Sequence, residues 1–236
     1  MLHVRVCRFS LNINKTVLNF PRYPIRAIPA PTQYGYRHYT HEFCLIRLNF
    51  WDMNEDMKIC IISDSHDRSA PLAAAITAAQ ADGAQAVIHC GDLIGVNTLR
   101  ASLGFGIPIH VVDGNNIGDV AALYRMMAKS GGLFTYHGQE ATLELGERKI
   151  FVTHMPHHGR AFACTGDYDL VCHGHSHAAH VGRQANINGG QCWLVNPGSV
   201  AGIDAPSVDA VPTWILGDLE RMSFEIRTLQ QSKLET

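Results

Sequence analysis

The sequence predicts an α/β fold, in which strands and helices alternate along one domain that begins near Met57. Short apolar runs rich in Ile, Val and Leu recur after this residue, and helix-like segments separate the first of them. Polar residues directly follow several of these runs. Because open α/β sheets place their ligand sites where strands end, this arrangement predicts a functional site at a sheet edge.

The first half of the domain predicts the order β-α-β-α-β. Residues 58–63 (KICIIS) form a short β-rich apolar run, which is typical of a buried strand. Residues 71–82 are rich in alanine, with Pro71 suited to a first helical turn and Gly83 to the helix end. The elements predicted next are strands at 86–90 and 108–112 and helices at 96–102 and 119–129.

Strands dominate the second half of the domain, after a glycine pair closes the last predicted helix. The segments are short and β-rich, and turn residues separate them. The predicted strands are residues 133–136, 141–145, 149–153, 170–172, 191–195, 213–216 and 223–228.

Residues 1–56 differ from this domain in composition. They contain several prolines and no clear helical period, and their seven Lys or Arg against four acids give a net charge of +3. Three readings stay open: a targeting peptide, an extension that packs on the domain, and translation from a start upstream of the true one. Ser10 is the only serine here, which argues against a transit peptide. We expect the folded domain to span residues 57–236.

The composition excludes several classes of protein. No apolar run approaches the roughly 20 residues that span a bilayer. Residues 57–236 carry 12 basic and 17 acidic side chains, a net −5, which argues against broad binding to a nucleic-acid backbone. The seven cysteines include no C-x-x-C pair, so they indicate a reducing compartment such as the cytoplasm.

Two metal-compatible motifs follow the first two predicted strands. Asp64 and His66 are two residues apart in Ser-Asp-Ser-His, so both side chains can point to one side of an extended loop. Asp92 follows Gly91 after the second strand. The alternatives are a polar loop with a capping Asp and, for Asp92, a helix N-cap.

Three more motifs follow later strands. Asn115 lies in Asp-Gly-Asn-Asn, which is otherwise a common turn sequence. His154 ends another apolar run, where a lone histidine is more often structural. His175 and His177 belong to His-Gly-His-Ser-His, the most specific signal, whose rival interpretation is an incidental His-rich metal tract. Residues 196–199 (NPGS) read as a turn that supports the site.

Together these positions predict a pair of divalent cations. Two carboxylates, one Asn and four His make about the right set for two adjacent ions. The mixed nitrogen and oxygen ligands fit Mn²⁺, Fe²⁺, Ni²⁺ and Zn²⁺, with Mn²⁺ as the first expectation. Bound cations would also offset the net negative charge of the domain.

The motif order D-x-H, G-D, G-N, T-H, G-H-S-H, N-P-G-S resembles the calcineurin-like metallophosphoesterase superfamily. The resemblance covers about residues 57–228, and MKICIISDSHD and VIHCGD are especially similar to the small YfcE-type phosphodiesterases, which are related to a retromer subunit. It implies a four-layer α/β/β/α sandwich with two mixed sheets. It also implies one metal held by Asp64, His66, Asp92 and His177 and a second by Asp92, Asn115, His154 and His175, so that Asp92 bridges.

The chain departs from the pattern of the family it resembles at the position where a proton donor is expected. Many relatives have His or Cys and then Asp after G-N, whereas Asn116 and Ile117 stand here. Relatives commonly read T-H-G-H, whereas this chain has T-H-M-P-H. We therefore predict His157 as the proton donor, and Asn116 as a residue that orients a phosphate oxygen.

The function expected from the resemblance is metal-dependent hydrolysis of small phosphodiesters by a dinuclear-metal-activated hydroxide. The alternative is a non-catalytic interaction module of the same fold, but all seven ligand positions are present and favour an enzyme. A nuclease is disfavoured because the domain is acidic and compact. The natural substrate stays open, as does assembly into a homo-oligomer.

Overall fold

The computed structural model describes residues 12–13, 16–17, 57–100 and 102–229. The chain divides into two compact units, residues 1–47 and 48–236. In the first unit, β1 (Asn12–Ile13) and β2 (Thr16–Val17) form a short antiparallel pair. The predicted extension 1–56 otherwise lies outside the described residues.

The first sheet of the domain has six strands in the order β13-β12-β3-β4-β5-β6. The four strands β3 to β6 run parallel, and β12 and β13 add antiparallel pairs, so the sheet is mixed. Its strands are β3 (Lys58–Ile62), β4 (Ala84–His89), β5 (Ile109–Val111), β6 (Phe134–Tyr136), β12 (Thr213–Asp218) and β13 (Ser223–Thr228). Its helices are α1 (Ser69–Ala81), α2 (Asn97–Arg100), the 3₁₀ turn η1 (Ser102–Phe105) and α3 (Val120–Lys129).

The second sheet has five strands in the order β10-β11-β9-β8-β7 and is also mixed. Its strands are β7 (Glu140–Leu145), β8 (Arg148–Thr153), β9 (Leu170–Cys172), β10 (His180–Ala185) and β11 (Gln191–Asn196). The helix α4 (Pro156–Ala163) packs on β8, β9 and β11.

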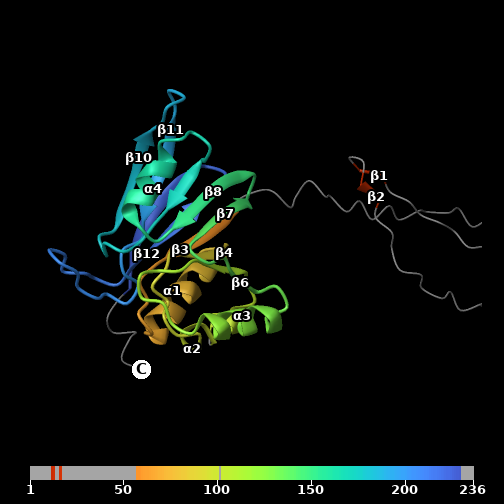
Figure 1. The fold of residues 1–236 in the computed structure, drawn as a ribbon, viewed down its shortest axis with the longest axis vertical. Coiled ribbons are helices and arrows are strands. Elements are labelled where there is room, and N and C mark those ends of the chain that lie inside the picture. Colours follow the sequence, from red (N-terminus) through yellow and green to blue (C-terminus); the bar gives the residue numbers. More distant parts are fainter. Residues whose placement is uncertain (1–11, 14–15, 18–56, 101, 230–236) are drawn as a thin grey trace, which may run out of the picture. The chain divides into compact units, whose positions relative to one another are not determined.

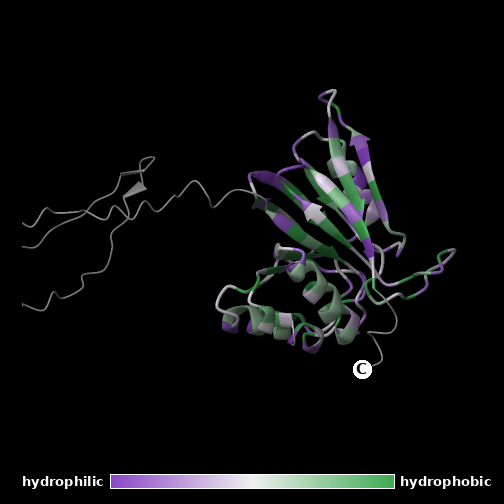
Figure 2. Cartoon of the chain, turned by 180° about the vertical axis from the view of Figure 1, so that it is seen from behind, coloured by the Kyte–Doolittle hydropathy of each residue, from purple (hydrophilic) through white to green (hydrophobic). Residues whose placement is uncertain are grey.

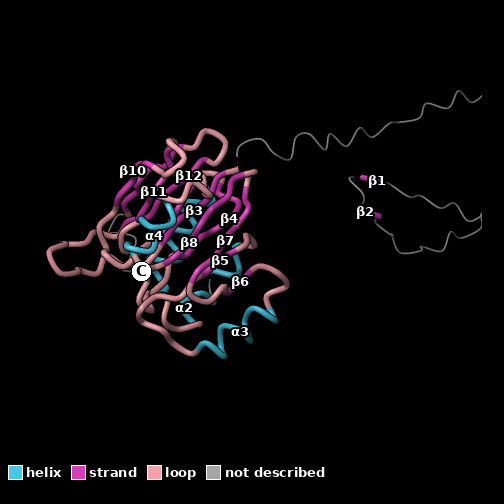
Figure 3. Tube along the Cα trace, turned by 45° about the horizontal axis from the view of Figure 1, so that its top comes forward, coloured by secondary structure: helices cyan, strands magenta, loops and turns pink. Residues whose placement is uncertain are grey.

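The two sheets face each other, and helices cover their outer faces (Figure 1). Along β3 the side chains alternate: Ile59 and Ile61 enter the core between the sheets, and Cys60 and Ile62 enter the core beneath the helices. Figure 2 shows hydrophobic residues running through both sheets and the helices, and Figure 3 places the strands in the middle of the domain. The expected four-layer α/β/β/α sandwich is confirmed.

In the domain from residue 57 onward, the structure adds three elements that the sequence did not predict, α4, β10 and the 3₁₀ turn η1. The α4 sequence PHHGRAFA spans only eight residues and packs through Phe162, which stacks on Phe151 with ring centroids 3.9 Å apart, and through Ala163, which is fully buried. The edge strand β10 has no buried residue and takes its conformation from antiparallel pairing with β11. No helix in the described part of the chain is long and apolar enough to cross a membrane.

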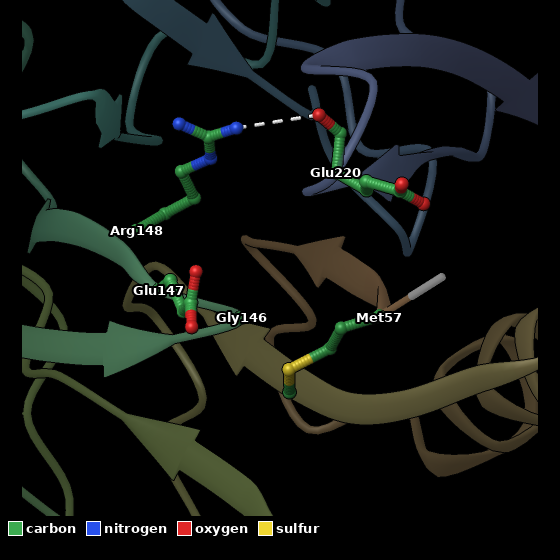
Figure 4. A pocket seen from close by; sticks show the side chains of 5 residues that line it. All are labelled: Met57, Gly146, Glu147, Arg148 and Glu220. Atoms are coloured by element: carbon green, nitrogen blue, oxygen red, sulfur yellow. Dashed lines mark hydrogen bonds between the residues drawn. The ribbon is translucent and has the colours of Figure 1, made fainter. Parts of the chain in front are cut away.

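A small cavity lies at the end of β3 opposite to Asp64 (Figure 4). Met57, the β7–β8 turn and Glu220 line this space of about 140 Å³. Arg148 donates from Nε to the Leu219 carbonyl at 2.9 Å and from Nη2 to the Glu220 carbonyl at 3.3 Å. These contacts tie the turns of the two sheets together at the edge away from the ligand motifs.

The core between the sheets provides a matched test of stability. We expect Ile61→Ala to lower the free energy of unfolding by about 2–5 kcal/mol, because it leaves a cavity in a closely packed layer. Ile61 is 0% exposed, whereas Ile187 is 82% exposed, so Ile187→Ala should change stability by less than about 0.5 kcal/mol. Urea unfolding followed by circular dichroism measures both, and equal effects would contradict this assignment of the core.

Candidate metal centre

Metal-compatible side chains come from loops at the carboxyl ends of parallel strands in both sheets. Because the sheets pack face to face, these loops converge at one end of the domain. Asp64 and His66 follow β3, Asp92 follows β4, Asn115 follows β5, His154 follows β8, and His175 and His177 follow β9.

The first cluster contains Asp64, His66 and His177. Nε2 of His66 lies 3.2 Å from Nε2 of His177, which in turn lies 3.2 Å from Oδ1 of Asp64. The same Asp64 oxygen lies 3.8 Å from Nε2 of His66. Metal–ligand bonds are about 2.0–2.2 Å long, so ligand atoms at this spacing can share one cation.

The second cluster contains Asn115, His154 and His175. Oδ1 of Asn115 lies 3.0 Å from Nε2 of His154 and 2.7 Å from Nδ1 of His175. An amide oxygen and two imidazole nitrogens therefore point at a common position beside the first cluster.

The carboxylate of Asp92 joins the two clusters. Its Oδ2 lies 3.7 Å from Nε2 of His66, and its Oδ1 lies 3.6 Å from Nε2 of His154. The backbone N–H of Asn116 donates to Oδ1 at 2.8 Å, and the side-chain amide donates to Oδ2 at 2.6 Å. Asn116 thus holds the carboxylate in an orientation that offers one oxygen to each cluster.

Backbone carbonyls fix the orientation of two imidazole rings in these clusters. Nδ1 of His154 donates to the Cys90 carbonyl at 2.8 Å, and Nδ1 of His177 donates to the Ile203 carbonyl at 2.6 Å. In the neutral rings, this leaves the Nε2 lone pairs aimed at the clusters. Metal-binding histidines characteristically donate their other nitrogen in this way.

The charge distribution also fits a cation. Oδ1 of Asp64 is buried and accepts no hydrogen bond, so it needs a positive partner. Burial alone would raise the pKa of Asp64, but the His177 imidazole beside it and the charge that protonated His154 would carry hold the pKa below its ordinary value. The Asp64 carboxylate raises the pKa of His177, and burial only partly offsets this. The donor set therefore fits divalent metal ions.

The backbone is strained at most of the proposed ligands. Non-glycine residues seldom adopt positive φ, and such conformations cost of order 1–3 kcal/mol each unless the surroundings enforce them. The affected ligands are Asp64 (+54°), His66 (+44°), Asp92 (+55°), His175 (+73°) and His177 (+54°). Strain concentrated in this way indicates a functional site.

The turn at residues 196–199 supports the site, as the sequence indicated. Nδ2 of Asn196 donates to the Gly174 carbonyl at 3.1 Å and to Oγ of Ser176 at 2.9 Å. Oγ of Ser199 donates to the Asp64 carbonyl at 2.9 Å. The turn thereby connects the loop after β3 with the His-rich loop after β9.

Two other histidines near the loops are structural. Burial lowers the pKa of both His89 and His173 to about 4, so each is neutral at physiological pH. Nε2 of His89 lies 3.0 Å from Oγ of Ser65, behind the first ligand loop. His173 packs against Gly159 of α4, where an added Cβ would lie 3.1 Å from its ring.

A cavity of about 180 Å³ adjoins the second cluster, and Asn115, His154, Glu140 and His158 are among its lining residues. His157, the predicted proton donor, is exposed on α4, with its ring centroid 4.4 Å from that of His158. The sequence analysis missed His158 and Glu140, and only their position beside the ligands singles them out. The roles of His157 and Asn116 stay predictions.

Comparisons with known proteins agree with this geometry. The sequence model of the calcineurin-like phosphoesterase superfamily domain matches residues 57–221. A phosphodiesterase of Methanocaldococcus jannaschii is 26% identical over 170 residues, which cover 71% of this chain and 96% of that protein. The probable metallophosphoesterase YsnB of Bacillus subtilis is 29% identical over 184 residues, which cover 75% of this chain and 92% of that protein.

Solved structures share the fold. An archaeal phosphodiesterase superimposes with a TM-score of 0.65 at 24% identity, covering 73% of this chain and all of that one (100%). Vacuolar protein sorting 29 of Cryptosporidium parvum superimposes with a TM-score of 0.51 at 18% identity, covering 75% of this chain and 93% of that one. The chain belongs to the calcineurin-like phosphoesterase superfamily, and it is a metal-dependent phosphoesterase.

Proposed function

We propose that this phosphoesterase hydrolyses small phosphodiesters and holds two divalent cations with the seven side chains predicted from the sequence. The observation that carries the proposal is the Asp92 carboxylate, whose two oxygens face different clusters, 3.7 Å from His66 and 3.6 Å from His154. The similarity to the Methanocaldococcus jannaschii phosphodiesterase supports a diester as substrate.

The side chains of the site would have distinct tasks. When bound, the two cations supply positive charge for the phosphate and lower the pKa of a coordinated water from ~15.7 to about 7. Asp64, His66, Asp92 and His177 would hold one ion, and Asp92, Asn115, His154 and His175 the other. Asn116 keeps the Asp92 carboxylate in place, and its sequence-predicted task of orienting a phosphate oxygen belongs to the same proposal.

The identity of the ions and the compartment are part of the proposal. Four imidazoles combined with carboxylate and amide oxygens suit Mn²⁺, with Ni²⁺, Fe²⁺ and Zn²⁺ as the other ions of matching chemistry. The described cysteines are free thiols, and most of them are buried in the core, which supports a reducing location such as the cytoplasm.

Metal removal and return tests the proposal. We expect protein stripped of metal to hydrolyse bis-p-nitrophenyl phosphate at the background rate, and added Mn²⁺ to restore turnover at two ions per chain. Mg²⁺ serves as the comparison, because it prefers all-oxygen ligands. Two bound ions without turnover for any diester would point to the interaction module instead, and no bound metal would overturn the ligand assignment.

A further inference from the structure

The cavity beside the second cluster has an acidic lining. Asp113 and Glu140 contribute carboxylates, Ile117 and Met155 contribute apolar surface, and no Lys or Arg is among its described lining residues. Asn115 and His154 form its inner end. A group attached to a phosphorus atom at the metal centre can therefore extend into this space, and the carboxylates disfavour a group that is itself anionic.

Glu140 and His158 form a pair in the wall of this cavity. Nδ1 of His158 lies 2.9 Å from Oε1 of Glu140, which begins β7, while His158 lies in the first turns of α4. A carboxylate that accepts the Nδ1 proton fixes the orientation of the ring, as in catalytic acid–base pairs. Nε2 is then the nitrogen available to a bound molecule. The His158 side chain is 49% exposed, so it can exchange protons with solvent.

We propose that this cavity binds the leaving alcohol of the substrate, and that His158, oriented by Glu140, donates a proton to the departing oxygen. The inference rests on the proposed phosphodiesterase function. As the oxygen of water bonds to phosphorus, the bond from phosphorus to the leaving oxygen breaks. The proton on Nε2 of doubly protonated His158 passes to that oxygen, which leaves as a neutral alcohol, and the ring regains a proton from solvent.

The proposal identifies the substrate class as diesters whose leaving alcohol carries no second phosphate or carboxylate. It also provides a proton donor in a chain that has Asn116 where many relatives have a histidine. Asn116 cannot donate a proton in place of a histidine, and both its backbone N–H and its side-chain amide donate hydrogen bonds to Asp92. His158 reaches the same end of the domain from the second sheet.

The test uses His158→Ala in the full chain, loaded with Mn²⁺. Two substrates are compared: bis-p-nitrophenyl phosphate, whose leaving group departs without a proton, and diphenyl phosphate, whose only leaving group is phenol. We expect kcat/KM for phenol release to fall by about 10²-fold or more, and for p-nitrophenol release by less than about 3-fold. The basic limb of the pH profile for phenol release should disappear, while metal stoichiometry and melting temperature stay unchanged.

Variants of neighbouring residues show whether His157 or His158 is the proton donor. His157→Ala tests the competing assignment, and a selective loss in this variant rather than in His158→Ala would overturn the proposal. Arg160→Ala is the control, because Arg160 is exposed on the same helix and does not line the cavity. Glu140→Gln should lower phenol release selectively, and a p-carboxyphenyl leaving group should react about 10-fold slower than an uncharged one of similar basicity.

Failure of the proposed function and failure of the His158 proposal give different results. A wild-type protein that cleaves no diester would contradict the proposed function. If the wild type is active but His158→Ala lowers kcat/KM equally for both leaving groups, or for neither, the result would contradict only the role of His158. A preference for the carboxylate-bearing leaving group would contradict the assigned substrate class.

Discussion

Asp92→Asn is expected to lower diester turnover by about 10³-fold or more, because it removes the charge shared by both clusters. In the wild type, the side-chain amide of Asn116 donates to the Asp92 carboxylate at 2.6 Å. The substitution replaces one carboxylate oxygen with an amide nitrogen, which is a donor and cannot accept from Asn116. We expect the metal content to fall from two ions per chain to one or fewer. Mass spectrometry of bound metal and initial rates with bis-p-nitrophenyl phosphate measure the two effects.

Asp119→Asn is the matched control for this change. Asp119 is exposed and caps α3 by accepting from the Ala122 N–H at 2.9 Å, and Asn caps helices about as well as Asp. We expect unchanged activity and metal content in this variant. A two-ion, fully active Asp92→Asn protein would show that the carboxylate does not bridge.

Gly114→Ala should damage the same centre through the backbone. An added Cβ would overlap Oδ1 of Asp92 and lie 2.7 Å from its Cγ, and this buried carboxylate has little room to move. We expect a stability loss of about 1–3 kcal/mol and loss of the second metal ion, because the loop with Asn115 must shift away. Calorimetric titration with Mn²⁺ and thermal unfolding report the two losses separately.

Gly104→Ala supplies the comparison for that substitution. Gly104 lies in η1, and an added Cβ would meet nothing within 4 Å. We expect metal binding as in the wild type and a change in unfolding free energy within about 0.5 kcal/mol. If both glycine variants bound two ions, the close approach of Gly114 to Asp92 would not be needed for metal binding.

Most elements of the fold were predictable from local pattern. The buried strands β3 and β9 are continuous apolar runs, and the ends of α1 follow from a proline in its first turn and a glycine after its last. The helix α4 was not predictable, since it is short and its contacts with Phe151 and His173 form only when β8 and β9 pair in the second sheet. The exposed edge strand β10 carries no apolar pattern, so only its partner β11 defines it.

The sequence alone predicts which side chains follow the strands. Parallel strands end at a common edge of the sheet, and the polar residues at that edge directly follow apolar runs in the sequence. The sequence therefore identified Asp64, Asp92, His154 and the other proposed ligands. How these side chains come together follows from the packing of the two sheets. Three features depend on contacts between separate elements of the fold: the left-handed backbone at five proposed ligands, the carbonyl of Ile203 behind His177, and the pairing of Glu140 with His158. No sequence pattern reveals such contacts, because only the folded chain brings these residues together.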